Sequence, residues 1–228
     1  MTSFDLSKQT KLKSLTLRDM TALKELDLSH MSELTTLYIR DCSAMQSINV
    51  SNIKNLTSAT IDNLDALTNV NLTGCSALTT LTCTGNAKLP ALNCGGCTSL
   101  TSLACNSNSA LASLNISDSA VLTTLDCYSC ALETLDLSNN VALTTLNCYS
   151  CALEALDLSN NVALKTLKCY SNLLESLDIS NNTAITSLDC SPNENLKTLY
   201  MKEGHTISKI NNKRDAGYIP DATEIIYK

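Results

Sequence analysis

The chain has 228 residues, 44% of them hydrophobic, a formal net charge of −6 and a sequence pI near 4.9. A nucleic-acid-binding protein normally carries a basic stripe, whereas the basic residues here cluster only in the short segment 209–214. No apolar run approaches the roughly 18 residues that a membrane-spanning helix needs, and no charged start followed by an apolar stretch marks a signal peptide. The composition therefore argues against nucleic-acid binding and membrane insertion.

The sequence opens inside a repeat, because Met1, Phe4 and Leu6 occupy the first, fourth and sixth positions of a repeating unit. A solenoid needs a polar cap over its first coil, and this sequence begins without one. We therefore expect that Met1 replaces a native residue and that upstream sequence, including an export signal, precedes this chain in the native protein.

From Leu12 onward the pattern L-x-x-L-x-L restarts every 11 residues, with three steps of 10. The units begin at Leu12, Leu23, Leu34, Met45, Leu56, Leu67, Leu78, Leu89, Leu100, Leu111, Leu122, Leu132, Leu143, Leu153, Leu164, Leu174, Ile185, Leu196 and Ile207. A fixed short period indicates an array in which each unit packs only against its neighbours.

An 11-residue period could also belong to a right-handed helical supercoil, but the spacing within each unit excludes a helix. The apolar positions are 1, 4, 6 and 9, as in Leu143, Leu146, Cys148 and Cys151. A step of two between positions 4 and 6 places both side chains on one face of a strand but on opposite sides of a helix. The many Ser, Thr and Asn residues also compete with helical hydrogen bonding. Each unit is therefore predicted to be a short strand followed by a turn.

Two units, 21 or 22 residues, should complete one turn of a repeat solenoid. We expect a mostly β fold with two short strands per turn and little or no helix. The solenoid should cover residues 1–210, and a capping segment should cover 211–228. That segment loses the repeat, gains charge and ends in 223–227, which we expect to form a strand over the last coil. A basic tail for a partner is the alternative interpretation of this end.

The stretch LDCYSCALETLDLSNNVALTTLNCYSCALEALDLSNNVALKTLKCYSNLLESLDISNN resembles bacterial leucine-rich repeats with nested periodicity, the IRREKO type. Those repeats follow L-x-x-L-x-[LC]-x-x-N-x-L-x-x-L-D-L-x-x-N, which this sequence matches closely at 122–199 and more loosely from Leu12. The resemblance implies a leucine-rich-repeat right-handed superhelix, in which the units starting at Leu122, Leu143 and Leu164 lie on a concave sheet. Their LDLSNN partners would lie on the convex side. It also implies a bacterial, secreted or cell-surface recognition scaffold with no single activity.

The twelve cysteines include three C-x-x-C pairs, which taken alone would suggest zinc binding or thiol redox chemistry. Register favours another interpretation, because every cysteine occupies position 6 or position 9 of a unit. Position 6 holds Cys83, Cys94, Cys105, Cys127, Cys148, Cys169 and Cys190, and position 9 holds Cys42, Cys75, Cys97, Cys130 and Cys151. A free cysteine behaves as a small buried hydrophobe, and at position 9 it replaces an asparagine whose amide would satisfy turn backbone groups. We predict structural thiols without metal or cofactor; a metal site and a redox or disulfide pair are the alternatives.

Positions 3, 5 and 7 point outward and hold the candidate binding residues. Position 7 carries Tyr128, Tyr149 and Tyr170 one turn apart, a ladder with apolar faces and polar tips that is suited to recognition. Its neighbours are Asp126, Asn147 and Lys168 at position 5 and Thr124, Thr145 and Thr166 at position 3. Tyr38 with Arg18 and Arg40 forms a second, smaller group. The alternative is that near-duplicated repeats generate such a ladder without selection for a ligand.

Two other outward columns suggest functions that we consider weaker. Asp136, Asp157 and Asp178 form a carboxylate column, but the Gly-rich calcium repeat of β-rolls is missing, so we expect a solvated acidic face. Thr80, Thr82 and Thr84 would suit ice binding if neighbouring turns did not break the regularity.

The sequence offers little for catalysis. His30 and His205 lie in distant repeats, and there is no Ser/His/Asp arrangement, phosphate loop or inward carboxylate pair. We therefore predict a monomeric, non-enzymatic scaffold with no catalytic residue.

The predicted function is binding of a protein or peptide through the concave face, as part of a secreted or cell-surface protein. The candidate contact residues are Tyr128, Tyr149, Tyr170, Asp126, Asn147, Lys168, Tyr38 and Arg40. The alternatives are a carbohydrate-binding surface module and a structural spacer of a larger surface protein.

Overall fold

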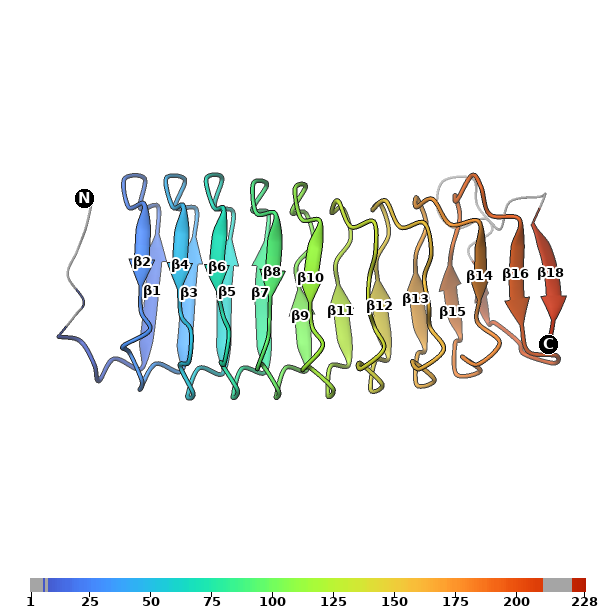
Figure 1. Cartoon of the computed structure of the whole chain (residues 1–228), viewed down its shortest axis with the longest axis horizontal. Helices are drawn as coiled ribbons and strands as arrows, with labels where there is room; N and C mark the ends of the chain where they lie inside the picture. The colour runs from blue at the N-terminus through green and yellow to red at the C-terminus, as the bar shows by residue number, and fades with distance from the viewer. Residues whose placement is uncertain (1–5, 7, 211–222) are drawn as a thin grey trace.

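The computed structural model describes Leu6, residues 8–210 and residues 223–228. These residues form an elongated β-solenoid whose turns stack side by side along one axis (Figure 1). The described part contains only strands and turns, and it has no helix long and apolar enough to cross a lipid bilayer. The predicted repeat solenoid is confirmed. The predicted opening unit lies largely outside the described residues.

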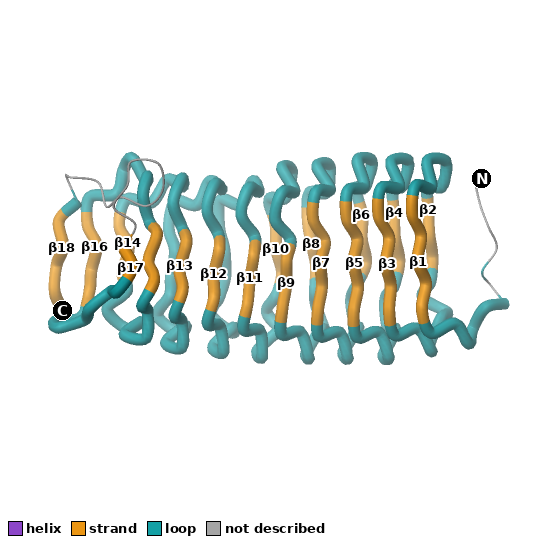
Figure 2. The backbone as a smooth tube through the Cα atoms, turned by 180° about the vertical axis from the view of Figure 1, so that it is seen from behind, coloured by secondary structure: helices purple, strands orange, loops and turns teal. Residues whose placement is uncertain are grey.

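One face of the solenoid is a continuous parallel sheet, which we call the long sheet (Figure 2). Its strands, in spatial order, are β1 (Ser14–Arg18), β3 (Thr36–Arg40), β5 (Ser58–Asp62), β7 (Thr80–Thr84), β9 (Ser102–Ala104), β11 (Thr124–Asp126), β12 (Thr145–Asn147), β13 (Thr166–Lys168), β15 (Ser187–Asp189) and β17 (Lys209–Ile210). Neighbouring strands pair one turn apart without slippage, as Thr124, Thr145 and Thr166 show. Equivalent positions of successive turns therefore form straight columns.

The opposite face, which we call the second face, carries two shorter parallel sheets. One contains β2 (Glu25–Asp27), β4 (Ser47–Asn49), β6 (Asn69–Asn71), β8 (Ala91–Asn93) and β10 (Ser113–Asn115). The other contains β14 (Ser176–Asp178), β16 (Thr198–Met201) and β18 (Glu224–Tyr227).

The turns at 122–142 and 143–163 lie between these two sheets and form a strand only on the long sheet. The prediction of two strands per turn therefore holds elsewhere but not in these two turns. Both belong to the stretch in which the segment after the long-sheet strand is one residue shorter.

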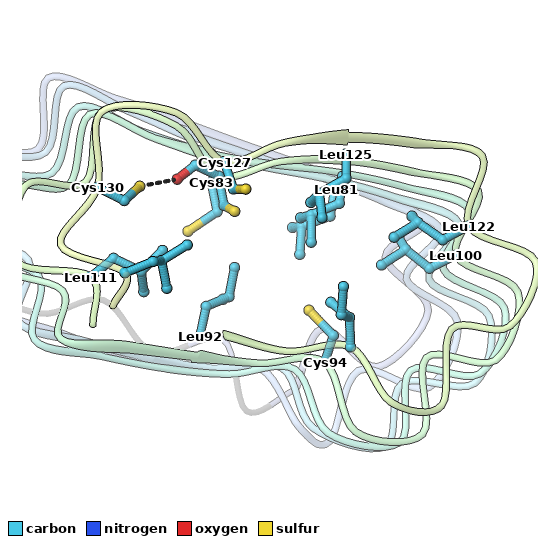
Figure 3. Close-up of a cluster of buried hydrophobic side chains, with 14 of the residues drawn as sticks. Leu81, Cys83, Leu92, Cys94, Leu100, Leu111, Leu122, Leu125, Cys127 and Cys130 are labelled. Atoms are coloured by element: carbon cyan, nitrogen blue, oxygen red, sulfur yellow. Dashed lines mark hydrogen bonds between the residues drawn. The ribbon is translucent and has the colours of Figure 1, made fainter. Parts of the chain in front are cut away.

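The core is a narrow column of inward side chains between the two faces (Figure 3). Leu100, Leu122 and Leu125 are fully buried, as are Cys83 and Cys127. Strand alternation points positions 4 and 6 inward and positions 3, 5 and 7 outward, although Asp189 and Ser191 in the β15 turn are also buried. Burying each leucine side chain contributes about 1.5–3 kcal/mol, so stability accumulates turn by turn along the array.

Strand β18 forms one edge of the second face in the described part of the chain. Strand β18 pairs with β16, and the Lys228 ammonium lies 2.6 Å from a carboxylate oxygen of Asp178. The same ammonium lies 3.9 Å from the centre of the Tyr200 ring. Residues 211–222 of the predicted capping segment lie outside the described residues.

Candidate functional site

The three tyrosines predicted to form a ladder each lie just beyond the end of a long-sheet strand. Tyr128, Tyr149 and Tyr170 come two residues after the ends of β11, β12 and β13. The serine after each tyrosine has a positive φ, 54° at Ser129, 52° at Ser150 and 53° at Ser171. The left-handed residue turns the chain at this corner, and the repeated geometry gives the three rings the same orientation.

The rings form a tight stack. The centroids of Tyr128 and Tyr149 are 4.4 Å apart with planes 7° from parallel, and those of Tyr149 and Tyr170 are 4.4 Å apart with planes 11° from parallel. Both faces of the Tyr149 ring are therefore covered by its neighbours. What the stack offers to a partner is mainly a row of ring edges and hydroxyl groups, since only the outer faces of Tyr128 and Tyr170 are not covered by another tyrosine.

Burial makes Tyr149 and Tyr170 harder to ionise. It raises the pKa of Tyr149 far above the usual value of 10, and the neighbouring Tyr170 and Tyr128 add to this shift. The pKa of Tyr170 is also raised, again mainly by burial. Tyr149 and Tyr170 therefore stay neutral at physiological pH and present hydroxyls that both donate and accept hydrogen bonds.

A polar column runs beside the tyrosine stack along the centres of the same strands. Asp126, Asn147 and Lys168 are in register on β11, β12 and β13, and all three side chains are half-buried. The amide nitrogen of Asn147 donates a hydrogen bond to Asp126, which fixes the orientation of both groups. We call the tyrosine stack and this column together the tyrosine patch.

The second predicted group lies on the same face but apart from the tyrosine patch. The Arg18 guanidinium carbon lies 4.6 Å from the centre of the Tyr38 ring, and Arg40 Nε lies 3.4 Å from oxygens of Asp41 and of Asp62. Strands β5, β7 and β9 separate this group on β1 and β3 from β11. The structure therefore places the candidate residues in two groups and does not bring Tyr38 and Arg40 to the tyrosine patch.

All twelve cysteines are free, and all but Cys151 are buried. At position 9 the thiols take over the hydrogen bond of asparagine. Asn108 Nδ2 donates to the carbonyl of Cys83 at 2.7 Å. One turn later Cys130 Sγ lies 3.3 Å from the carbonyl of Cys105, and this contact is the dashed line at Cys130 in Figure 3. Within the described residues no group of three or more His, Cys, Asp or Glu side chains is arranged to hold a metal ion.

The aspartate column on the second face is built from local turns. Asp136 and Asp157 each accept a hydrogen bond from the backbone N–H of the serine two residues later, at 3.0 Å and 2.9 Å. Hydrogen bonds from those serines lower the pKa of both carboxylates. A small hollow of about 150 Å³ lies between the two turns. These carboxylates already have structural partners, which supports the interpretation of an acidic surface.

The two histidines make contacts with backbone carbonyls in different parts of the chain. His30 Nε2 lies 3.2 Å from the Leu6 oxygen, and His205 Nε2 lies 2.9 Å from the Ile185 oxygen.

Two surface features were not predicted from the sequence. Position 2 of the long-sheet units carries a threonine ladder, in which Thr123 Oγ1 donates to the Thr101 carbonyl and Thr144 Oγ1 to the Thr123 carbonyl, both at 3.0 Å. Val141 and Val162, one turn apart, are more than half exposed, at 52% and 56%. The repeated threonine at one position was visible in the sequence, but its hydrogen-bonding role depends on register.

The fold defined by these strands and columns is a leucine-rich-repeat β-solenoid. A scan against protein-family models found no match, and a search of curated proteins found none either.

Solved structures with some likeness to this chain include internalins and leucine-rich-repeat proteins. The functional domain of InlJ from Listeria monocytogenes, described as including a cysteine ladder, is 23% identical with a TM-score of 0.46; the match covers 88% of this chain and 60% of that one. The internalin InlF from Listeria monocytogenes is 16% identical with a TM-score of 0.43, covering 97% of this chain and 88% of its own. A leucine-rich-repeat protein from Bacteroides ovatus is 14% identical with a TM-score of 0.33, covering 96% and 66%. The fold assignment itself rests on the strand pairing of this chain.

Proposed function

We propose that this chain is a non-enzymatic recognition scaffold that binds a protein or peptide through the long sheet, which corresponds to the predicted concave face, with the tyrosine patch as its contact site. One observation carries the proposal: three stacked tyrosines follow consecutive strands of the long sheet, beside an acidic, an amide and a basic side chain. Tyrosine edges and hydroxyls with mixed polar neighbours are the composition of protein contact surfaces.

The rigidity of the patch also supports recognition. Each ring is held by its neighbours and by the corner that follows it, so binding costs little side-chain entropy. Tyr38 and Arg40 are proposed as a separate, secondary contact on the same face.

Carbohydrate recognition is the weaker candidate. Sugar rings bind tyrosine by lying on the face of the aromatic ring, and both faces of Tyr149 are occupied by Tyr128 and Tyr170. Only the outer faces at the two ends of the stack could take a sugar in this way.

The setting of the scaffold is part of the proposal. The resemblance of the repeats to bacterial leucine-rich repeats supports a secreted or cell-surface protein, with residues 1–210 as the solenoid and 211–228 as its cap. The competing hypothesis is a spacer role within a larger surface protein. A spacer would need no contact site, so the tyrosine patch would then have no binding function.

A random peptide library displayed on phage, selected against the immobilised chain, tests the contact site. We expect selected peptides to lose at least about tenfold in affinity for a Tyr128→Ala, Tyr149→Ala, Tyr170→Ala variant, as hot-spot tyrosines usually do. The matched control replaces Glu133, Glu154 and Glu175, three exposed residues of the second face, with glutamine. Peptides that bind the tyrosine variant and the native chain equally would show that the site is assigned wrongly.

A further inference from the structure

The outward residues on the three central strands of the long sheet, β11, β12 and β13, are arranged symmetrically about β12. At position 3 the five central strands carry Ser102, Thr124, Thr145, Thr166 and Ser187. At position 7 the same turns carry Asn106, Tyr128, Tyr149, Tyr170 and Ser191. The order at position 3 is the same from either end. Position 7 shares only the three central tyrosines, because it ends in Asn106 on one side and in the buried Ser191 on the other.

The charges at position 5 are antisymmetric about the same strand. Asp126 lies one strand before Asn147, and Lys168 lies one strand after it. The flanking residues at this position are Ala104 and the buried Asp189, which is 5% exposed. A surface with opposite charges at equal distances from its centre is complementary to itself after a half-turn rotation.

We propose that the partner of the tyrosine patch is a second copy of this chain, bound face to face with the two rods antiparallel. The proposal rests on the proposed function and names the partner of the same site. The two-fold axis runs parallel to β12 and passes over Asn147, midway between the two sheets. Such an isologous interface is the commonest way in which identical chains associate.

This rotation reverses the order of the turns but keeps each position of the repeat opposite itself. Asp126 then faces the partner's Lys168, and Lys168 faces the partner's Asp126. Sheets that pack face to face are about 10 Å apart, a gap that a lysine and an aspartate can bridge together. The two tyrosine stacks meet along their edges and hydroxyls, the parts of the rings that the stacking leaves free.

The charges exclude the other two-fold arrangement, in which the rods are parallel. An axis along the rod would place every strand opposite its own copy, so Asp126 would face the partner's Asp126 and Lys168 the partner's Lys168. Like charges placed directly opposite are unfavourable across an interface.

The size of the overlap predicts a weak, reversible dimer. Centred on β12, the overlap reaches from β7 to β17. It buries roughly 1,000 Å² in total, near the lower limit for a specific interface. This departs from the monomer that the sequence suggested, and it leaves the Tyr38 and Arg40 group uncovered.

Sedimentation equilibrium over a range of concentrations tests the proposal with charge-exchange variants. Asp126→Lys makes the patch doubly basic, and Lys168→Asp makes it doubly acidic. We expect each variant alone to dimerise at least about tenfold more weakly than the native chain, because like charges now face each other. An equimolar mixture of the two should associate again, since all four introduced and native charges then pair across the interface. The Asp126→Lys, Lys168→Asp double variant should also recover self-association.

Asp136→Lys, which changes an exposed residue of the second face, is the matched control and should dimerise like the native chain. Thermal unfolding of each variant shows whether it is folded, and the mixture and the double variant remain informative if one single variant is not. A native chain that stays monomeric up to about 1 mM, or a mixture that does not associate, would overturn the proposal. If the phage library yields no binding peptide while the native chain still dimerises, binding of a foreign partner is refuted and the dimer proposal is not affected.

Discussion

Asn108 and Cys130 make the same hydrogen bond one turn apart. The asparagine amide donates to the carbonyl of Cys83 at 2.7 Å, and the thiol lies 3.3 Å from the carbonyl of Cys105. The two acceptors hold equivalent positions in successive turns. The asparagine does more, because its oxygen also accepts a bond of 2.7 Å from the backbone N–H of Asn86. Asparagine and cysteine are therefore related but unequal solutions for the same buried corner.

This relationship predicts different costs for removing the two side chains. Asn108→Ala leaves several buried backbone groups without a partner and should destabilise the fold by about 2–4 kcal/mol, whereas Cys130→Ala should cost about 1–2 kcal/mol. Urea unfolding measures both, with the exposed Asn181→Ala as control. Equal losses for Asn108→Ala and Cys130→Ala would contradict the account of position 9.

The position-6 thiols should behave as hydrophobes. Leucine and isoleucine fill this position in other turns, so Cys127→Val should change the free energy of unfolding by no more than about 1.5 kcal/mol. Cys127→Ser places a hydroxyl in the fully buried core and should cost about 1–3 kcal/mol. The urea midpoints of the Cys127→Val and Cys127→Ser variants test this prediction. A serine variant as stable as the valine variant would argue against a dry interior.

The fold should lose stability in alkaline solution. Burial raises the pKa of Cys75 and Cys130 to about 11 and of Cys83 and Cys190 to about 12. In the unfolded chain thiols ionise near their ordinary pKa of 9, so above that pH the unfolded state binds fewer protons than the folded state. Stability should be fully present below pH 9 and fall as pH rises through 11 to 12. Urea midpoints measured from pH 7 to 11 test this. A double variant with Cys83→Val and Cys190→Val should lose less stability over this pH range than the native chain.

The tyrosine stack should give an optical signal of its own. Parallel rings with centroids 4.4 Å apart couple electronically, and the near-ultraviolet circular dichroism should reflect this coupling. Tyr149→Ala removes the middle ring and should abolish the coupling while costing about 1–3 kcal/mol, since two stacked pairs are lost. Tyr149→Phe keeps three rings in contact and serves as the control. An unchanged spectrum in the alanine variant would show that the rings do not stack in solution.

Much of the fold could be predicted because one pattern, repeated many times, fixes it. The step between Leu146 and Cys148 requires a strand, and the shared register of the cysteines indicates buried columns rather than paired metal ligands. The missing second strands at 122–142 and 143–163 could not be predicted, because strand pairing on the second face depends on backbone geometry that the repeat pattern does not encode.

The candidate site was only partly predictable. The one-turn spacing of Tyr128, Tyr149 and Tyr170 indicates a ladder, but the coverage of both faces of Tyr149 depends on ring orientation. The separation of Tyr38 and Arg40 from the tyrosine patch could be predicted, because three long-sheet strands lie between β3 and β11. The symmetry about β12 becomes visible only when the columns are aligned in the register that the structure gives.

The accessibility of the thiols tests the central claim most directly, namely that leucines and cysteines share one dry interior between the two faces. Ellman's reagent, added to the native chain in the presence of a chelator, should label at most Cys151, the one half-buried cysteine, and should label all twelve cysteines in denaturant. Rapid labelling of several thiols in the native chain, or thiols released only after stoichiometric zinc is removed, would contradict it.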